Sequence, residues 1–571
     1  MNKFRPFILA VTVILSAFIA YGLWSRPRVA DSSCSSFSAQ RVVADIEQIS
    51  KNHHSVAHPA ERAEVREYLV SRLNELGADT VKLFEYKDLT GPENKHVVYT
   101  FDATNVLAEF HPQQGEGSTS LLFVAHYDSR YIQPMPHQDT VWSYGAADDG
   151  YGVGVILETM KQVLALRSEW KQGVKVLFTD AEEVGMKGMK AMWEQNREQF
   201  EDVGMMINIE ARGPWGPALL FETSNGNEKI MELYDKAANY PFTYSLTTVV
   251  YNFMPNFTDF TIVKEDIPGM NFSTVADINH YHTDLDNFSN INPKSIQHYG
   301  EQITPIAIEY LTNEQYADKD ALRATSDTTN FTIPLLGLFN LSKGGYMWIN
   351  IAVFVLFLLL LALNALRGKV SLAKVGSSAG ITLLAAIGAL VAGELVAFIC
   401  ATASDVKFKP FGIQQGIVYD NAAMIATVAL LAVIVSVIYL WRRRAAAQKC
   451  TNSIRESAKS VAINLYTTNK LYGALLLLCL LSLILLIALG ENLMFFIPLT
   501  AATAALLLYR VTRLKVWLLA AITITLLHAF SFLYALAMAL TIGALGAITM
   551  LAVCDILVLL PLADLYCSKR V

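Results

Sequence analysis

The sequence has few charged residues and few cysteines for its length. Only 17% of the 571 residues are charged and 53% are hydrophobic, whereas about a quarter of the residues of a typical soluble domain are charged. This composition excludes a disordered chain, a coiled coil and a collagen-like repeat. Of the 6 cysteines, only Cys34 lies between residues 31 and 345, so that region has no internal disulfide and is not a disulfide scaffold.

Basic residues are scarce in one part of the chain and acidic residues in the other. Residues 31–345 contain 44 acidic and 24 basic residues, a balance of −20, and the rest of the chain contains 7 acidic and 21 basic residues, a balance of +14. An acidic block beside a basic, apolar block predicts a soluble domain joined to a membrane domain. The acidic block lacks the clustered Lys and Arg that phosphate contacts need, which argues against nucleic acid as a partner.

An apolar run at residues 7–24 follows Lys3 and Arg5. No small-residue cleavage site follows this run, so we expect a retained membrane anchor, with a cleaved signal peptide as the alternative. The predicted division of the chain is 1–30 for the anchor, 31–345 for a soluble domain and 346–571 for a membrane domain of about seven helices.

Seven apolar runs follow residue 345, most of them near the roughly 20 residues with which a helix crosses a bilayer. They cover residues 347–366, 379–403, 421–441, 472–490, 493–509, 516–538 and 544–565. With a cytoplasmic N-terminus, eight spans place 15 of the 17 Lys and Arg residues after residue 345 on the cytoplasmic side, as the positive-inside rule predicts. We therefore expect the soluble domain on the periplasmic or extracellular side of a bacterial inner membrane or, alternatively, in the lumen of a vacuole or of the endoplasmic reticulum.

Four ionisable residues, Glu394, His528, Asp555 and Asp564, lie within these runs or at their ends. Ionisable groups inside a bilayer are costly and often functional. No series of charges follows one face of a predicted span, so hydrogen bonds between helices are favoured over a transport pathway.

The soluble domain alternates strand and helix patterns. Short apolar runs typical of buried strands lie at residues 120–125, 174–179, 205–209 and 218–221. Helical patterns lie at residues 60–76, 151–166, 188–199 and 228–239. This alternation predicts an α/β fold, a mixed and mostly parallel sheet with helices on both faces, followed by an all-α multi-span membrane domain.

Polar side chains gather where these strands are predicted to end. His126 and Asp128 follow the first strand, Glu182 and Glu183 follow the second, and Glu210 ends the third. Each feature alone has an ordinary explanation, such as a satisfied polar pair or a solvated turn, and the Asp-Asp pair at 148–149 is a good helix N-cap. Together they predict a zinc site, because imidazole and carboxylate are zinc ligands, and one carboxylate can bridge two metal ions.

The motifs HYDS, GAADDG, DAEEVG, NIEARG and YHTDLDN occur in this order from residue 126 to residue 287. In order and spacing they resemble the zinc exopeptidase family of bacterial leucyl aminopeptidase, aminopeptidase Y and glutamate carboxypeptidase. The resemblance covers roughly residues 40–315. A peptidase domain placed before a multi-span membrane region is similar in layout to the fungal vacuolar membrane protease and the animal endoplasmic-reticulum metallopeptidase.

The resemblance implies two zinc ions per chain. His126 and Glu210 would hold one ion, Glu183 and His282 would hold the other, and Asp148 would bridge both. Many members of the family have Asp where this chain has Glu210. A glutamate still ligates zinc, with one methylene more of reach.

The resemblance also implies residues around the metals. Glu182 would be the general base, Asp128 would orient His126 as carboxylates commonly do for metal-bound imidazoles, and Tyr281 would help to stabilise the oxyanion. Asp259 is either a further support residue or a helix N-cap. In this mechanism metal binding makes water acidic, and Glu182 takes its proton and later gives it to the leaving amine.

The leading function is therefore a two-zinc exopeptidase that acts on peptides at a lipid bilayer. An aminopeptidase is favoured because the acidic surroundings suit a free α-amino group, for which Glu210, Asp149 and Asp284 are candidate partners. A carboxypeptidase is the alternative because Arg130 and Arg212 flank two motifs. The sequence is also compatible with a single-zinc glutaminyl-cyclase-like enzyme and with a non-catalytic membrane receptor or transporter. It predicts no particular oligomeric state.

Overall fold

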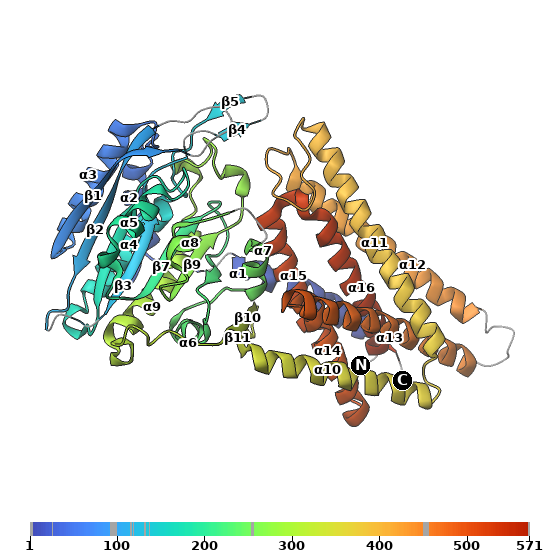
Figure 1. Cartoon of the computed structure of the whole chain (residues 1–571). Coiled ribbons are helices and arrows are strands. Elements are labelled where there is room, and N and C mark those ends of the chain that lie inside the picture. The colour runs from blue at the N-terminus through green and yellow to red at the C-terminus, as the bar shows by residue number, and fades with distance from the viewer. Residues whose placement is uncertain are drawn as a thin grey trace. The chain divides into compact units, whose positions relative to one another are not determined.

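The computed structural model of the protein describes residues 4–24, 27–91, 100–114, 117, 119–130, 133–135, 138–252, 256–448 and 456–568. The chain forms two compact units (Figure 1). The soluble unit consists of Trp24–Thr332 and Leu336–Lys343. The helical unit consists of Met1–Leu23, Ile333–Leu335 and Gly344–Val571.

A seven-stranded mixed sheet forms the centre of the soluble unit. Its strands are β1 (Thr80–Thr90), β2 (Thr100–Phe110), β3 (Ser120–His126), β6 (Gly173–Thr179), β7 (Val203–Ala211), β8 (Leu219–Thr223) and β9 (Gly269–Thr274). Their order is β1-β2-β6-β3-β7-β9-β8. The four strands from β6 to β9 in this order are parallel to one another, and β1, β2 and β8 pair with their neighbours in antiparallel fashion. Two small hairpins pair β4 (Gln133–Met135) with β5 (Gln138–Val141) and β10 (Thr328–Ile333) with β11 (Gly337–Ser342).

Helices cover both faces of this sheet. They are α2 (Ala39–Ile49), α3 (Pro59–Glu75), α4 (Gly150–Leu164), α5 (Lys187–Gln195), α6 (Glu228–Ala237), α7 (Ser245–Asn252), α8 (Asp259–Val263) and α9 (Pro293–Thr312). Alternate residues of β3 enter two different cores: Leu121 and Phe123 pack with α4 and α9, whereas Leu122 and Val124 pack with α5 and α8. The period of two in a strand explains this division, and the predicted fold class is confirmed.

The parallel register brings the carboxyl ends of the central strands to one edge of the sheet. His126, at the end of β3, pairs with Thr179, at the end of β6. Glu210, near the end of β7, pairs with Ser273 of β9. Ligand sites of open α/β sheets form at this edge.

The helical unit contains long apolar helices. They are α1 (Arg5–Trp24), α10 (Lys343–Leu366), α11 (Leu372–Ala403), α12 (Asp420–Gln448), α13 (Glu456–Leu489), α14 (Leu493–Thr512), α15 (Val516–Leu540) and α16 (Leu545–Cys567). Among the described residues, seven stretches are long and apolar enough to cross a membrane, and the last of them, Val516–Cys567, contains both α15 and α16. A 3-10 turn at Thr541–Ala544 separates these two helices, which pack against each other.

Polar contacts at the helix ends show which ends lie together in this unit. Arg5, at the start of α1, donates to the carbonyl oxygen of Ser568 at 3.1 Å, just beyond the end of α16. Lys515, which precedes α15, donates to the same oxygen at 2.6 Å. Arg443, near the end of α12, lies 2.7 Å from Asp564 of α16. The start of α1 and the ends of α12 and α16 therefore lie at one end of the helical unit.

The turns at the other ends of these helices also contact one another, in two separate pairs. The Thr541 hydroxyl, in the turn between α15 and α16, donates to the carbonyl oxygen of Gln414 at 2.7 Å, in the loop between α11 and α12. The side-chain amide of Asn492, which precedes α14, donates to Asn350 near the start of α10 at 2.8 Å. These pairings agree with an antiparallel course of successive helices, including α15 and α16.

Candidate metal centre

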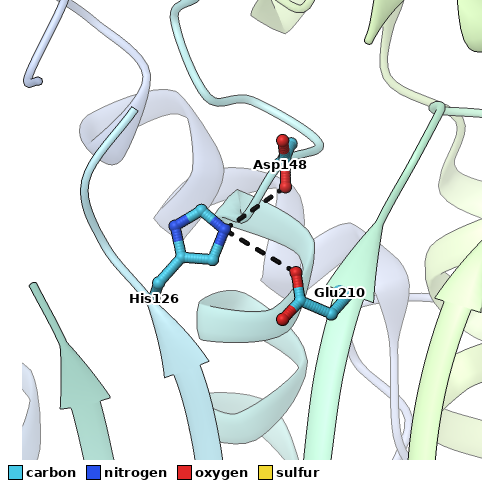
Figure 2. A group of neighbouring side chains, drawn as sticks. All are labelled: His126, Asp148 and Glu210. Atoms are coloured by element: carbon cyan, nitrogen blue, oxygen red, sulfur yellow. Dashed lines mark hydrogen bonds and ion pairs between the residues drawn. The ribbon is translucent and has the colours of Figure 1, made fainter. Parts of the chain in front are cut away.

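The first group of ligand-type side chains joins two strand ends and one loop. In Figure 2, the His126 ring from the end of β3 faces Asp148, which lies just before α4, and Glu210 from β7. Nε2 of His126 lies 3.3 Å from Oδ1 of Asp148 and 3.8 Å from Oε2 of Glu210. All three side chains are buried.

A second group shares one of these residues. Nε2 of His282 lies 3.3 Å from Oδ2 of Asp148 and 3.0 Å from Oε2 of Glu183. Glu183 belongs to the turn after β6, and His282 belongs to the loop that follows β9, with a left-handed φ of 59°. Asp148 thus presents one carboxylate oxygen to each histidine, which is the arrangement of a bridging ligand.

Both groups fit zinc in chemistry and in spacing. Zinc bonds of 2.0–2.1 Å in a tetrahedron separate neighbouring ligand atoms by about 3.3 Å, and the contacts of His126 and His282 range from 3.0 to 3.8 Å. Oε1 of Glu183 is buried without a hydrogen-bond partner among the described residues. A cation bound between the carboxylates would satisfy this atom.

The carboxyl groups at this edge repel one another. Burial raises the pKa of Glu210 to about 8, and the charge of Asp148 adds to the shift. Burial also raises the pKa of Glu182 well above its usual range, with the charge of Glu210 adding to it. Buried like charges are stable only with a compensating cation, so this arrangement favours a bound metal.

The ring of His126 is oriented through its other nitrogen. Nδ1 lies 2.9 Å from the backbone oxygen of Asp128 and 3.6 Å from its carboxylate. A proton on Nδ1 leaves the Nε2 lone pair facing Asp148 and Glu210. The Asp128 carboxylate also accepts hydrogen bonds from the backbone N–H groups of Glu182 at 2.9 Å and Glu183 at 3.3 Å.

Glu182 belongs to neither ligand group. It lines a cavity of about 50 Å³ that Asp148 and Glu210 of the two ligand-type groups also line. The other residues that line the cavity are Asp148, Glu210, Arg212, Phe221, Tyr251, Asn256, Phe257, Thr258, Ser273 and Tyr281. A carboxylate in this position is free to exchange a proton with a molecule in the cavity.

Tyr281 lines the same cavity and stacks on a predicted ligand. Its ring centroid lies 3.6 Å from that of His282, with 23° between the ring planes. The guanidinium carbon of Arg212 lies 5.6 Å from the Tyr281 ring. Asp149 and Asp284 do not line the cavity: Asp149 is the N-cap of α4 and accepts from the Gly152 N–H.

Asp259 is the first residue of α8 and is not its N-cap. The N-cap is Thr258, which forms a capping box with Thr261. The buried carboxylate of Asp259 accepts a hydrogen bond from the Thr179 hydroxyl at the end of β6, and burial raises the pKa of Asp259 to about 6. The N-cap interpretation of Asp259 is therefore wrong, because the N-cap of this helix is the residue before it.

Sequence reasoning did not identify two supporting residues. Asp286 accepts hydrogen bonds from the backbone N–H groups of Ala147 at 2.7 Å and Asp148 at 3.3 Å. The Asn208 amide donates to Oε1 of Glu210 at 3.0 Å. The signals were a second aspartate in the YHTDLDN motif and an isolated polar residue inside the apolar run at 205–209.

Comparison with known proteins agrees with the motifs. Residues 105–307, which lie in the soluble unit, match the family model of Peptidase family M28. Endoplasmic reticulum metallopeptidase 1 of Mus musculus is 28% identical over 275 residues, which cover 48% of this chain and 29% of that protein. The vacuolar membrane protease of Schizosaccharomyces pombe is 25% identical over 334 residues, which cover 55% of this chain and 35% of that protein. The chain thus matches about a third of the length of these relatives.

Among solved structures, a Zn-dependent exopeptidase from Parabacteroides distasonis is similar to this chain. It is 21% identical, and the match covers 49% of this chain and 99% of that one, with a TM-score of 0.38. The family resemblance predicted from the five motifs is confirmed by the M28 match and by the two membrane-protein relatives.

Proposed function

We propose that the protein is a membrane-anchored exopeptidase with two zinc ions per chain. The observation that carries this proposal is the position of Asp148, whose two carboxylate oxygens lie 3.3 Å from Nε2 of His126 and 3.3 Å from Nε2 of His282. A bridging carboxylate between two histidine-containing groups is typical of two-metal hydrolases. A single-zinc cyclase has no need of the second group.

Zinc, when bound, supplies a Lewis acid that polarises the substrate carbonyl and makes water more acidic. The protein contributes the proton transfers. Glu182 accepts a proton from the attacking water and delivers it to the amine nitrogen as the carbon–nitrogen bond breaks. Tyr281, which lines the same cavity, would donate a hydrogen bond from its hydroxyl to the developing oxyanion.

The helical unit anchors the enzyme in the membrane in this proposal. The start of α1 and the ends of α12 and α16 lie together, and the Lys- and Arg-rich segments adjoin these ends. The positive-inside rule then places these ends in the cytoplasm. The soluble unit would face the periplasm or the cell exterior in a bacterium, or an organelle lumen in a eukaryote.

An aminopeptidase is the first candidate because Glu182 and Glu210 place acidic groups in the cavity, which suits a free α-amino group. Carboxypeptidase action is a second candidate, favoured by Arg212 in the same cavity. Arg130 does not support the second candidate, because it donates to the backbone oxygen of Glu183 and lies 3.4 Å from its carboxylate.

The test uses the full-length protein with zinc added and a free tripeptide, its N-acetyl form and its C-terminal amide. An aminopeptidase cleaves the free peptide and the amide but not the N-acetyl form. A carboxypeptidase cleaves the N-acetyl form but not the amide. No hydrolysis of any form by a zinc-loaded protein would overturn the peptidase proposal and favour a receptor or transporter.

A further inference from the structure

Arg212 is a cation beside the metal centre whose charge is not neutralised by an ion pair within the described residues. It follows Glu210 by two residues, is half-buried and lines the cavity. Its guanidinium carbon lies 5.6 Å from the centroid of the Tyr281 ring, and this contact with an aromatic ring does not neutralise its charge. Arg130, another arginine near the site, is occupied by Glu183.

Two further hydrogen-bond donors, Tyr251 and Asn256, line the same cavity. The Tyr251 hydroxyl and the side-chain nitrogen of Asn256 form no hydrogen bond with any residue that the structure describes. Tyr251 is only 8% exposed, and its ring packs edge-on against Phe221 with centroids 5.0 Å apart. A buried donor without a partner is costly, so a ligand that accepts from these groups would be stabilised.

The three groups share one chemistry. Arg212 and the Asn256 amide nitrogen are donors only, and the Tyr251 hydroxyl can donate. The guanidinium fork of an arginine matches the two oxygens of a carboxylate. The carboxylates in the cavity, Glu182 and Glu210 among them, belong to the proposed base and metal ligands. We therefore expect a bound ligand to supply the oxygen atoms that accept hydrogen bonds from Arg212, Tyr251 and Asn256.

We propose that Arg212, Tyr251 and Asn256 form a carboxylate-binding subsite next to the metal centre. The substrate is then a peptide with a free carboxylate close to the bond that is cut. That carboxylate is either the C-terminus of a very short peptide, such as a dipeptide, or the side chain of an Asp or Glu residue. That this ligand is a substrate rests on the proposed peptidase function, whereas the binding of a carboxylate at this subsite does not.

Hydrolysis gives the first measurement. For the full-length, zinc-loaded protein, we expect kcat/KM for a dipeptide to exceed that for its C-terminal amide by about 10- to 150-fold, the range for a hydrogen bond to a charged group. Arg212→Gln should remove this preference by lowering the value for the acid alone. Arg212→Lys should keep part of it, because lysine keeps the charge and loses the fork. Tyr251→Phe should lower the preference for the acid over the amide about 2- to 10-fold.

The matched control is Arg197→Gln. Arg197 lies outside the cavity, with its guanidinium carbon 4.2 Å from the Trp193 ring centroid and an ion pair to Asp266 at 3.1 Å. This variant also loses one positive charge, and we expect it to keep the preference for the acid. An equal loss with acid and amide substrates in Arg212→Gln would make Arg212 a positioning residue for Tyr281 and would overturn the subsite.

Equilibrium binding separates the two proposals. Ketomethylene analogues of a dipeptide cannot be hydrolysed, and their affinity is measured as the free acid, as the amide and as an amide with a Glu side chain. Tighter binding of the acid, lost in Arg212→Gln, supports a subsite for the terminal carboxylate. Tighter binding of the Glu-containing amide supports a subsite for a side chain. Equal binding of all three analogues overturns the subsite whatever hydrolysis shows, and tight acid binding without any hydrolysis overturns the peptidase alone.

Discussion

The Asp128 carboxylate accepts a hydrogen bond of 2.9 Å from the backbone N–H of Glu182. Through the neighbouring Glu183 N–H, at 3.3 Å, it holds the proposed base and a proposed zinc ligand at the same time. The backbone oxygen of Asp128 also fixes His126. One residue just after β3 therefore connects both ligand groups with the turn after β6.

Asp128→Asn should weaken the whole site, because an amide nitrogen replaces one of the two acceptors of this turn. We expect zinc affinity to fall about 10- to 100-fold, the usual effect of losing a group that supports metal ligands, with a lower kcat. Zinc titration and peptide hydrolysis measure both. The control is Asp45→Asn. Asp45 lies on α2 and forms an ion pair of 2.8 Å with Arg72 of α3, so this variant also loses a negative charge but should leave zinc affinity unchanged.

The two ligand groups should respond differently to substitution. We expect elemental analysis to give close to two zinc ions per wild-type chain. Asp148→Ala should reduce both, because it belongs to both groups, whereas His282→Ala should reduce the count towards one. A wild-type protein purified without chelator that contains well under one zinc per chain would refute the two-zinc proposal.

Glu182→Gln should separate metal binding from catalysis. Glutamine keeps the size of the side chain but cannot accept the proton from water. We expect zinc content near that of the wild type and a kcat lower by about 10²–10⁴-fold, the usual contribution of acid–base catalysis. Loss of zinc in this variant would instead mean that Glu182 is a ligand.

Reporter fusions should reveal the course of the chain through the membrane. We expect a reporter that is active only after export to be active when fused after residue 330 and inactive after residues 450 and 571. The reason is the clustering of Lys and Arg at one set of helix ends, where Arg443 and Arg5 contact the end of α16. Activity of the fusion after residue 450 would contradict eight passes.

His298 should make the stability of the soluble unit fall in acid. Its buried ring accepts at Nδ1 from the Ala218 N–H at 2.9 Å, and its Nε2–H donates to the Tyr240 oxygen at 3.0 Å. Burial lowers the pKa of His298 to about 4. The folded state therefore favours the neutral ring, and this contribution is complete above about pH 6.5, the usual pKa of histidine, and is lost as the pH falls from there towards about 4.

The pKa difference corresponds to about 3 kcal/mol of unfolding free energy. Thermal unfolding of the full chain at pH 7 and pH 5 measures the effect. His298→Gln should narrow the difference in melting temperature between these two pH values, because glutamine does not titrate. Part of the difference should remain, since burial also lowers the pKa of His54 to about 4. An unchanged difference in the variant would exclude His298 as a cause.

Strands with continuous apolar runs were predictable, and exposed strands were not. The run at 120–125 corresponds to β3, all of whose residues are buried between the two layers of helices. Strand β1 (Thr80–Thr90) at the edge of the sheet is mostly exposed, so its sequence contains no apolar run. The pattern at 188–199 was predicted as one helix, whereas α5 ends at Gln195 and a 3-10 turn follows at Arg197–Phe200.

The sequence by itself determined the strand–helix alternation, the apolar spans and the set of ligand-type residues, because hydrophobic period and residue chemistry are local properties of a chain. Only the tertiary structure decided which groups meet. The parallel register of β6, β3 and β7 places Glu182, His126 and Glu210 at one edge. Folding also gathers Arg212, Tyr251 and Asn256 around one cavity. Such contacts join distant segments, and no local pattern encodes the distance between them.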